Sequence, residues 1–168
     1  MIKSPATLTR FRFWFGFLFL CLAGTGGLRP ARAEPTTLVF DNLSSDSGLT
    51  QNTVNAVLQD SRGYLWIATQ GGLHRYDGYR MQVLPNTGPD RLPDTFLNAL
   101  IEDQVERLWI GSSTSGLSLF DLRSGRMRAL PAESLRLRGE EQQIHALAVD
   151  DAALWIGSDA GVRRVDSQ

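Results

Sequence analysis

The sequence predicts an all-β fold, a partial β-propeller of about three four-stranded blades that follows an N-terminal signal peptide. Three observations support this prediction: one line of sequence occurs three times, each repeat contains strand-like segments separated by turn residues, and the first segment differs in composition from the rest. The repeated line is LWIATQGGLHRYD at 65–77, LWIGSSTSGLSLFD at 108–121 and LWIGSDAGVRRVD at 154–166. The chain therefore divides into a signal peptide, residues 1–33, and propeller repeats, residues 34–168.

Residues 1–33 have the three parts of a secretory signal peptide. A basic start is followed by the short apolar run FWFGFLFLCLAG at 13–24, and ARA at 31–33 matches the small-x-small pattern that signal peptidase recognises. We expect cleavage after Ala33 and export from the cytoplasm. The alternative is an uncleaved inner-membrane anchor, but the apolar run is shorter than the ~18 to 20 residues that a spanning helix requires.

Composition excludes several classes of protein. Cys21 is the only cysteine and leaves with the signal peptide, so the mature chain has no disulfide and no cysteine nucleophile or metal ligand. Residues 34–168 contain 12 basic and 18 acidic side chains, a net charge of −6. Nucleic acids and anionic membrane surfaces are therefore poor partners. The mature length suffices for one domain with a sizeable core.

The repeat extends well beyond the quoted line. Trp66, Trp109 and Trp155 are the only tryptophans outside the signal peptide, and they lie 43 and 46 residues apart. Three upstream segments also match: TVNAVLQD (53–60), FLNALIED (96–103) and QIHALAVD (143–150). A period near 43 residues is typical of propeller blades. We expect three units, at about 48–90, 91–137 and 138–168.

Each unit is predicted to consist of strands joined by tight turns. Its apolar stretches are short, rich in β-branched or aromatic residues, and bounded by Gly, Asp, Asn and Ser. The first unit predicts four strands, at 53–59, 64–69, 73–77 and 80–84. SRG at 61–63 and DGY at 77–79 supply the hairpin turns, where glycine accepts the positive φ that such turns require.

The pattern within the strands indicates how the units pack. The inner strands are apolar on successive residues, as in AVL, NALI and LWI, so both faces of each sheet should be covered, as in a propeller blade. The third unit ends after its third strand, and LVF at 38–40 is similar to the fourth strand of a blade that ring closure would complete. These strands amount to three blades, whereas propellers typically have four to eight. We therefore expect the N-terminal piece of a longer protein or a truncated gene product.

Some side chains that could bind a ligand or a metal are better explained by the architecture. A tryptophan at one fixed place per repeat predicts a core wedge between blades rather than the lining of a ligand channel. Three aspartates recur in register just before a turn, where a side-chain bond to the backbone is a commoner role than metal binding. They are Asp60, Asp103 and Asp150.

The remaining candidates do not form a site. His74 and His145 fall at unrelated repeat positions, so they are not a paired ligand set. SSDSG at 44–48 lacks the alternating acids and the terminal Glu of a calcium loop. No phosphate-binding loop and no Ser or Cys nucleophile motif is present. The sequence therefore predicts no catalytic, cofactor-binding or metal-binding residue, no cofactor, and no enzymatic activity.

Residues 48–84, GLTQNTVNAVLQDSRGYLWIATQGGLHRYDGYRMQVL, resemble the two-component regulator propeller family. They match the pattern of that family. The pattern has a start similar to GLS with a V after it, then QD and a turn that contains G, and then LWIGT and GLxRYDG. The second unit departs at QVE, 104–106, where the usual glycine is absent. The third shortens its turn to DAA at 151–153 and has GV at 161–162 in place of GL. The resemblance covers roughly residues 38–166.

The resemblance implies a periplasmic N-terminal sensor of a larger bacterial signalling protein. In this family a further β-domain, a membrane helix and a cytoplasmic histidine kinase or diguanylate cyclase usually follow, and no residue here corresponds to those output domains. The implied partners are further blades, an output domain and an unknown small-molecule or glycan ligand. Exposed strand edges also predict self-association.

Two other classes of function stay open. A secreted propeller enzyme of the lyase or lactonase type also carries LWxx-type repeats, but it places acids, histidines or metal ligands in the central channel, and that set is missing here. A structural interaction propeller of the pyrroloquinoline-repeat type is suggested by LFDLRSG at 119–125, although only the second unit has this glycine. A metal content measurement and a hydrolase screen would separate the enzyme from the sensor.

Overall fold

The computed structural model describes residues 39–166 apart from 89, 131–134, 136, 138 and 152. The expected signal peptide, residues 1–33, lies outside the described residues. The described residues from 41 onward belong to one compact unit. Within the described ranges, no helix is both long enough and apolar enough to cross a membrane.

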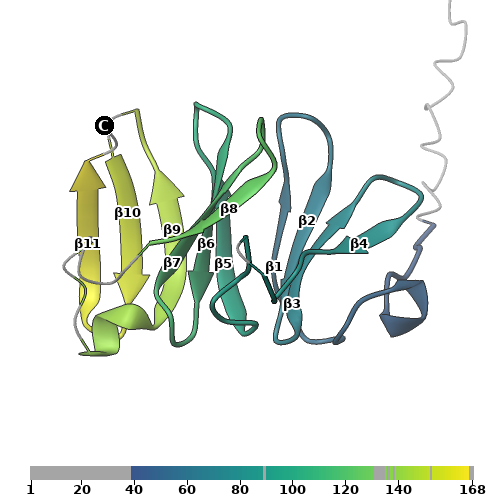
Figure 1. The fold of residues 1–168 in the computed structure, drawn as a ribbon, viewed down its shortest axis with the longest axis horizontal. Coiled ribbons are helices and arrows are strands. Elements are labelled where there is room, and N and C mark those ends of the chain that lie inside the picture. Colours follow the sequence, from purple (N-terminus) through teal and green to yellow (C-terminus); the bar gives the residue numbers. More distant parts are fainter. Residues whose placement is uncertain are drawn as a thin grey trace, which may run out of the picture. The chain divides into compact units, whose positions relative to one another are not determined.

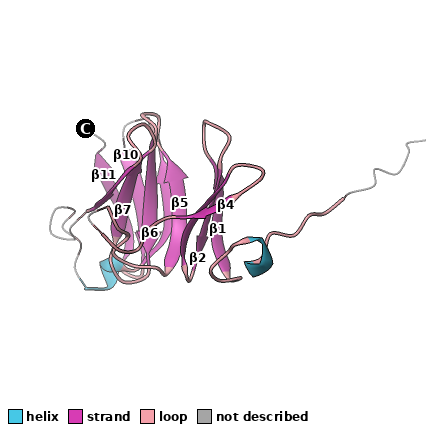
Figure 2. Ribbon diagram, turned by 45° about the vertical axis from the view of Figure 1, so that its right-hand side comes forward, coloured by secondary structure: helices cyan, strands magenta, loops and turns pink. Residues whose placement is uncertain are grey.

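The described residues form eleven strands in three antiparallel sheets, which lie side by side (Figures 1 and 2). Blade 1 contains β1 (Val54–Gln59), β2 (Leu65–Thr69), β3 (Gly72–Tyr76) and β4 (Met81–Val83). Blade 2 contains β5 (Leu97–Glu102), β6 (Arg107–Ser112), β7 (Leu117–Asp121) and β8 (Arg126–Ala129). Blade 3 contains β9 (Ile144–Val149), β10 (Ala153–Ser158) and β11 (Gly161–Asp166). Two short 3-10 helices, η1 (Ser45–Ser47) and η2 (Gly139–Gln142), precede blades 1 and 3.

The predicted strand pattern is confirmed. Every strand of the first unit agrees with its predicted range to within one residue at each end, and the strands of each blade pair in sequence order. The Asp-Gly turn is also formed: Asp77 Oδ1 accepts hydrogen bonds from the backbone N–H groups of Tyr79 and Arg80, at 2.8 and 2.7 Å. Gly78 has φ 94°, which a glycine accepts without strain.

The core lies between the blades. Trp66 and Ala68 on β2 are fully buried in one cluster with Leu108 and Ile110 on β6. The rings of Trp66 and Phe120, from different blades, lie 5.2 Å apart between centroids. The facing sides of blades 1 and 2 therefore cover each other, as the runs of apolar residues predicted. The expectation that both faces of every sheet are covered is wrong for the outer side of blade 1, where Val57 is 57% exposed.

Trp109 repeats this arrangement between blades 2 and 3. It clusters with Leu154 and Ile156 of β10, whereas its chain neighbours Leu108 and Ile110 belong to the cluster on the other side of blade 2. Successive strand residues point to opposite faces of a sheet. The prediction that Trp109 is a buried wedge, with its two neighbours on the opposite face, is confirmed.

Trp155 does not follow the other two tryptophans. It is 38% exposed, compared with 0% for Trp66 and 8% for Trp109. Val162 lies on the same face of blade 3 and is 76% exposed. The expectation that all three tryptophans are buried wedges is therefore wrong for Trp155, because the described residues contain no blade to cover that face.

The strand expected at 38–40 is not formed. Val39 and Phe40 lie outside any strand and are each 84% exposed, and Leu38 lies outside the described residues. The expectation depended on ring closure, in which a last blade would supply the partner strand. The described residues contain no such partner, so these backbone groups do not pair.

Two asparagines link neighbouring blades at one repeat position. The Asn55 side chain donates a hydrogen bond to the first carbonyl of β5 at 2.8 Å, and Asn98 donates to the first carbonyl of β9 at 2.9 Å. His145 occupies the same position in blade 3, where its Nε2 lies 2.7 Å from Asp159 Oδ1. An asparagine side chain thus bonds each of the first two blades to the next one, and blade 3 has a histidine at the same repeat position.

Candidate functional site

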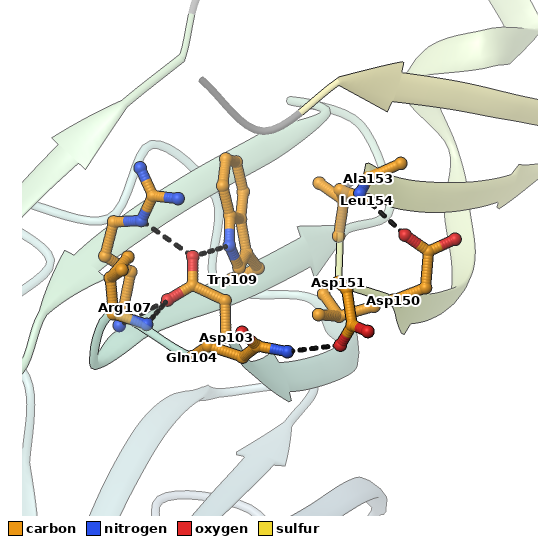
Figure 3. Close-up of a pocket in the computed structure, with 10 residues that line it drawn as sticks. Asp103, Gln104, Arg107, Trp109, Asp150, Asp151, Ala153 and Leu154 are labelled. Atoms are coloured by element: carbon orange, nitrogen blue, oxygen red, sulfur yellow. Dashed lines mark hydrogen bonds and ion pairs between the residues drawn. The ribbon is translucent and has the colours of Figure 1, made fainter.

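A cleft of about 300 Å³ opens between blades 2 and 3, at the end that carries the β5–β6 and β9–β10 turns (Figure 3). Its polar lining comes from Asp103, Gln104, Arg107, Asp150 and Asp151. Its apolar lining comes from Val105, Trp109, Val149, Ala153 and Leu154. A concave site with apolar walls and a few convergent polar groups is the usual form of a small-molecule site.

Asp103 organises the blade 2 side of the cleft. Its Oδ1 accepts hydrogen bonds from the backbone N–H groups of Val105 and Arg107, at 3.0 and 2.9 Å. Its Oδ2 accepts from Arg107 Nε at 2.7 Å and from Trp109 Nε1 at 2.9 Å. The bonds to the backbone confirm the turn role that the sequence predicted. The bond to the indole was not predicted, because sequence position alone does not show that the carboxylate reaches the wedge.

The same pair of residues recurs in each blade. Trp66 Nε1 donates to Asp60 Oδ2 at 2.7 Å, and Trp155 Nε1 donates to Asp150 Oδ2 at 2.8 Å. Asp60 and Asp150 also accept backbone N–H bonds within their own turns. The three aspartates therefore tie each turn to its tryptophan, and that role explains their regular spacing.

The charge of Asp103 is fixed by its surroundings. Burial disfavours the carboxylate and by itself raises the pKa, but the hydrogen bonds from Trp109 and Arg107 outweigh it, so the pKa of Asp103 lies below its ordinary value. The Arg107 guanidinium lies 5.4 Å from the centre of the Trp109 ring. An aspartate that stays ionised in this way is an acceptor near neutral pH and not a proton donor.

The blade 3 side of the cleft contributes two further carboxylates. Asp150 faces its own turn, where its Oδ1 accepts from Ala153 N at 2.8 Å. Asp151 is exposed, and its Oδ1 accepts from Gln104 Nε2 of blade 2 at 2.7 Å (Figure 3). Gln104 and Asp151 therefore bridge the two blades across the cleft. The sequence marked both positions only as departures from the family's turn pattern and not as site residues, although both directly follow the recurrent aspartate.

The β5–β6 turn has an unusual backbone at the cleft's edge. Glu106 has φ 62°, the one positive φ of a non-glycine residue in the described part of the chain. It stands three residues before Trp109, as Gly63 stands before Trp66. This is the departure from the family pattern seen at 104–106. The Glu106 carboxylate pairs with Arg62 of blade 1 and, at 3.2 Å, with Arg123 of blade 2, and its hydrogen bonds to these two residues lower its pKa.

A second hollow, of about 520 Å³, lies at the same turn and is lined by Ser61 of blade 1, Val149 of blade 3 and residues of blade 2. Its polar lining includes Ser61, whose Oγ and N–H donate to the two carboxylate oxygens of Glu102 at 2.6 and 2.7 Å. Because Ser61 occupies the position of Gln104 one repeat earlier, both blade contacts carry a polar bridge after the recurrent aspartate. The two hollows share the β5–β6 turn as a wall.

The histidines lie apart from the cleft. His74 on β3 is fully buried, and its Nε2 accepts a hydrogen bond from Thr50 N at 3.0 Å. His145 lies in blade 3 beside Asp159. Within the described ranges, no three or more His, Cys, Asp or Glu side chains are grouped so that they could hold a metal ion. The structure also places residues 45–47 of the SSDSG segment in η1, with Ser44 as its N-terminal cap.

Comparison with known proteins supports the resemblance stated above. The family model described as "Two component regulator propeller" matches residues 48–71, within the segment on which the resemblance was based. The histidine kinase P4 of Formosa agariphila is 32% identical over 59 residues, which are 35% of this chain and 4% of the kinase. The resemblance to two-component regulator propellers is therefore confirmed, and the family model matches the first repeat, at residues 48–71.

Solved structures that match this chain include natural and designed proteins. The extracellular domain of a putative hybrid two component system from B. thetaiotaomicron is 18% identical, with a TM-score of 0.47 over 74% of this chain and 26% of that one. The computationally designed Ika4 protein is 15% identical, with a TM-score of 0.51 over 70% of this chain and 68% of that one. At this identity the likeness to Ika4 concerns the fold alone. The chain thus spans a small part of the natural proteins it resembles.

Proposed function

We propose that this chain, whose first repeat matches the two-component regulator propeller family, is the periplasmic ligand-sensing module of a bacterial signal-transduction protein. The observation that carries the proposal is the match over residues 48–71, which is also the most regular of the three repeats. The identity with a histidine kinase points to the same kind of system. The propeller blades then supply a rigid frame, and the turns at their ends supply the binding surface.

The geometry of the cleft favours binding over catalysis. The carboxylate of Asp103 is engaged by four donors and has a lowered pKa, so it does not serve as a general acid near neutral pH. Asp60 and Asp150 hold their tryptophans in the same way. A metal content measurement with a lyase and hydrolase screen tests this assignment. Turnover that is abolished by a cleft variant would favour the secreted enzyme instead.

Export is the second part of the proposal. A cleavable signal peptide at residues 1–33 would place the propeller in the periplasm, with Glu34 as the first residue of the mature chain. Mass spectrometry of the product recovered outside the cytoplasm tests this directly. A mature mass that lacks the first 33 residues is expected, and a product that keeps them would favour an inner-membrane anchor.

Further blades and an output domain are the third part. The exposed face of Trp155 and Val162 supports it, because blades 1 and 2 bury the same face against a following blade. Reading the DNA downstream of codon 168 tests this part. An in-frame continuation with more LWIG-like units is expected, and a stop codon followed by no such sequence would leave a genuine three-blade protein.

Ligand binding is tested by thermal unfolding of the purified chain against a library of small molecules and glycans. A ligand that binds only the folded protein stabilises it by about 2.7 kcal/mol when present at 100 times its Kd. We expect at least one compound to raise the Tm in a saturable manner and to lose its effect when the cleft is altered. If no compound does so, the propeller acts as an interaction module rather than a sensor.

A further inference from the structure

Each blade has one face that meets the following blade, and the tryptophan of its second strand lies on that face. A leucine of the third strand shares this face in the first two blades, where Leu73 and Leu117 are fully buried in the blade contacts. Val162 occupies the same position in blade 3, because all three residues pair with the residue two places after the tryptophan. Val162 is 76% exposed and Trp155 is 38% exposed. This face of blade 3 therefore has no cover among the described residues.

The opposite face of each blade meets the preceding blade, and blade 1 leaves this face open. The first residues of β5 and β9, Leu97 and Ile144, are buried in the contacts with the preceding blades. Val54 is the first residue of β1 and occupies the same position, but it is 42% exposed. Val57 lies on the same face and is 57% exposed, whereas its counterpart Leu100 packs against the core between blades 1 and 2. Blade 1 therefore presents uncovered aliphatic side chains at the positions that blades 2 and 3 bury.

The contact between blades 2 and 3 shows how two such faces fit together. A Cβ atom at Gly111 would lie 2.5 Å from Cγ2 of Ile144, so the isoleucine packs directly on the glycine backbone. Gly157 occupies the position of Gly111 in blade 3, two residues after the tryptophan. The three atoms nearest to a Cβ at Gly157 all belong to Ala146 of the same blade. The open face of blade 3 therefore has room for the first residue of an incoming blade, and Val54 is such a residue.

We infer that a second copy of this chain covers the open face of blade 3, with its own blade 1 packed there through Val54 and Val57. Blade 2 lies between blades 1 and 3 (Figure 1), so the two open faces belong to opposite ends of one row and the copies associate head to tail. A head-to-tail contact that closes makes a ring. Two copies supply six blades, within the usual range of about 4 to 8, whereas three copies would exceed it. The expected assembly is therefore a closed dimer with two equal contacts.

The inference goes beyond the sensing role and does not depend on a ligand. In a longer chain the same two faces would be covered by that chain's own blades, so the second copy is the partner of residues 34–168 as they stand. The contact also differs from pairing at a strand edge. It buries the faces that carry Trp155 and Val57, and it leaves the outer edge of β11 unpaired.

The test uses one variant for each face and then mixes the two. Val162→Glu blocks the face of blade 3, and Val57→Glu blocks the face of blade 1; both positions are exposed, so neither change disturbs the buried core. The readout is sedimentation velocity of the chain purified in its exported form, over a range of concentrations. Every head-to-tail contact needs both faces, so each variant alone should dissociate at least roughly tenfold more readily than the natural chain, because the contact would bury an unpaired carboxylate.

The mixture is the decisive measurement. It should form a 1:1 complex, because Val57→Glu keeps the face of blade 3 and Val162→Glu keeps the face of blade 1. That complex should be weaker than the natural dimer, since one of its two contacts is intact. Tyr79→Glu adds the same charge at an exposed turn residue and should behave as the natural chain.

Three results would overturn the inference. A natural chain that stays monomeric has no such contact. Association of either variant alone, as strong as that of the natural chain, would mean that like faces meet or that strand edges pair. A mixture that stays monomeric, although both variants unfold in urea as the natural chain does, would mean that the two faces do not fit each other.

Discussion

The indole nitrogen of Trp109 donates a hydrogen bond to Asp103 across the β5–β6 turn at 2.9 Å. The bond joins two features that the sequence shows separately: the aspartate that closes a turn, and the tryptophan that packs between blades. Because both recur in each blade, a blade's turn and its contact with the next blade are fixed by the same carboxylate. The cleft lies beside this pair, so its walls are held in place by the architecture of the blade.

Truncation of Trp109 should be strongly destabilising. Trp109→Ala removes a wedge that is 8% exposed and leaves a cavity between blades 2 and 3, at a cost of about 3 to 5 kcal/mol. Trp155→Ala is the matched control, because it removes the same side chain and the same bond to an aspartate from a face that is not covered. The free energies of unfolding in urea should differ accordingly. A loss below about 1 kcal/mol for Trp109→Ala would show that the wedge contributes little.

Protonation of His74 should make stability depend on pH. Burial lowers the pKa of the imidazole, against the opposing effect of the backbone carbonyls of Ile67 and Gly72. Its Nε2 accepts from the Thr50 N–H, so protonation there would also set two donors against each other. In the unfolded chain His74 gains a proton as the pH falls through about 6.5, while the folded protein keeps it neutral. Stability is therefore complete above that pH and falls below it.

The measurement compares urea unfolding of the natural chain and of His74→Gln between about pH 7.5 and 5, a window that spans the ordinary histidine pKa. The variant cannot titrate at this position, so the slope of stability against pH should be smaller. NMR titration of His74 in the folded protein provides an independent check, since its pKa should lie below its ordinary value. Identical slopes for the two proteins would contradict the prediction.

Much of this fold could be predicted because the residues of the repeat have strong local preferences for strands and turns. The Asp-Gly turn at 77–78 and the apolar strands specify the first blade, and the ends of its strands were predicted to within one residue. The exposed state of Trp155 could not be predicted in the same way, because its sequence surroundings match those of Trp66. Whether a wedge is covered depends on the presence of a neighbouring blade, which local sequence does not show.

The cleft was missed for a related reason. Gln104, Arg107 and Asp151 have no common motif, and they meet only because blade 3 packs against blade 2. A signal was nevertheless available in the sequence, because the turns at 104–106 and 151–153 both depart from the pattern of the first unit.

The positive φ of Glu106 predicts a gain from glycine. Glu106→Gly and Glu106→Ala both remove the carboxylate that pairs with Arg62 and Arg123, but only glycine accepts φ 62° without a Cβ penalty. The glycine variant should therefore melt about 3 °C above the alanine variant. Differential scanning calorimetry of the pair measures this difference, with the lost ion pairs common to both. Equal melting temperatures would mean that the turn relaxes around alanine.

The last prediction concerns the uncovered face of blade 3. Trp155 and Val162 present apolar surface that blades 1 and 2 bury, and uncovered blade faces and strand edges favour pairing with other chains. The chain of residues 34–168 should therefore self-associate in analytical ultracentrifugation, in a manner that depends on concentration. Val162→Glu should reduce association, because it places a charge on that face. Tyr79→Glu, at a turn residue that is 93% exposed, is the control and should have no effect.

Extension of the chain by further repeats should suppress association and raise the Tm together, since both follow from covering one surface. A strictly monomeric species with a sharp, cooperative melt would show instead that three blades form a complete fold.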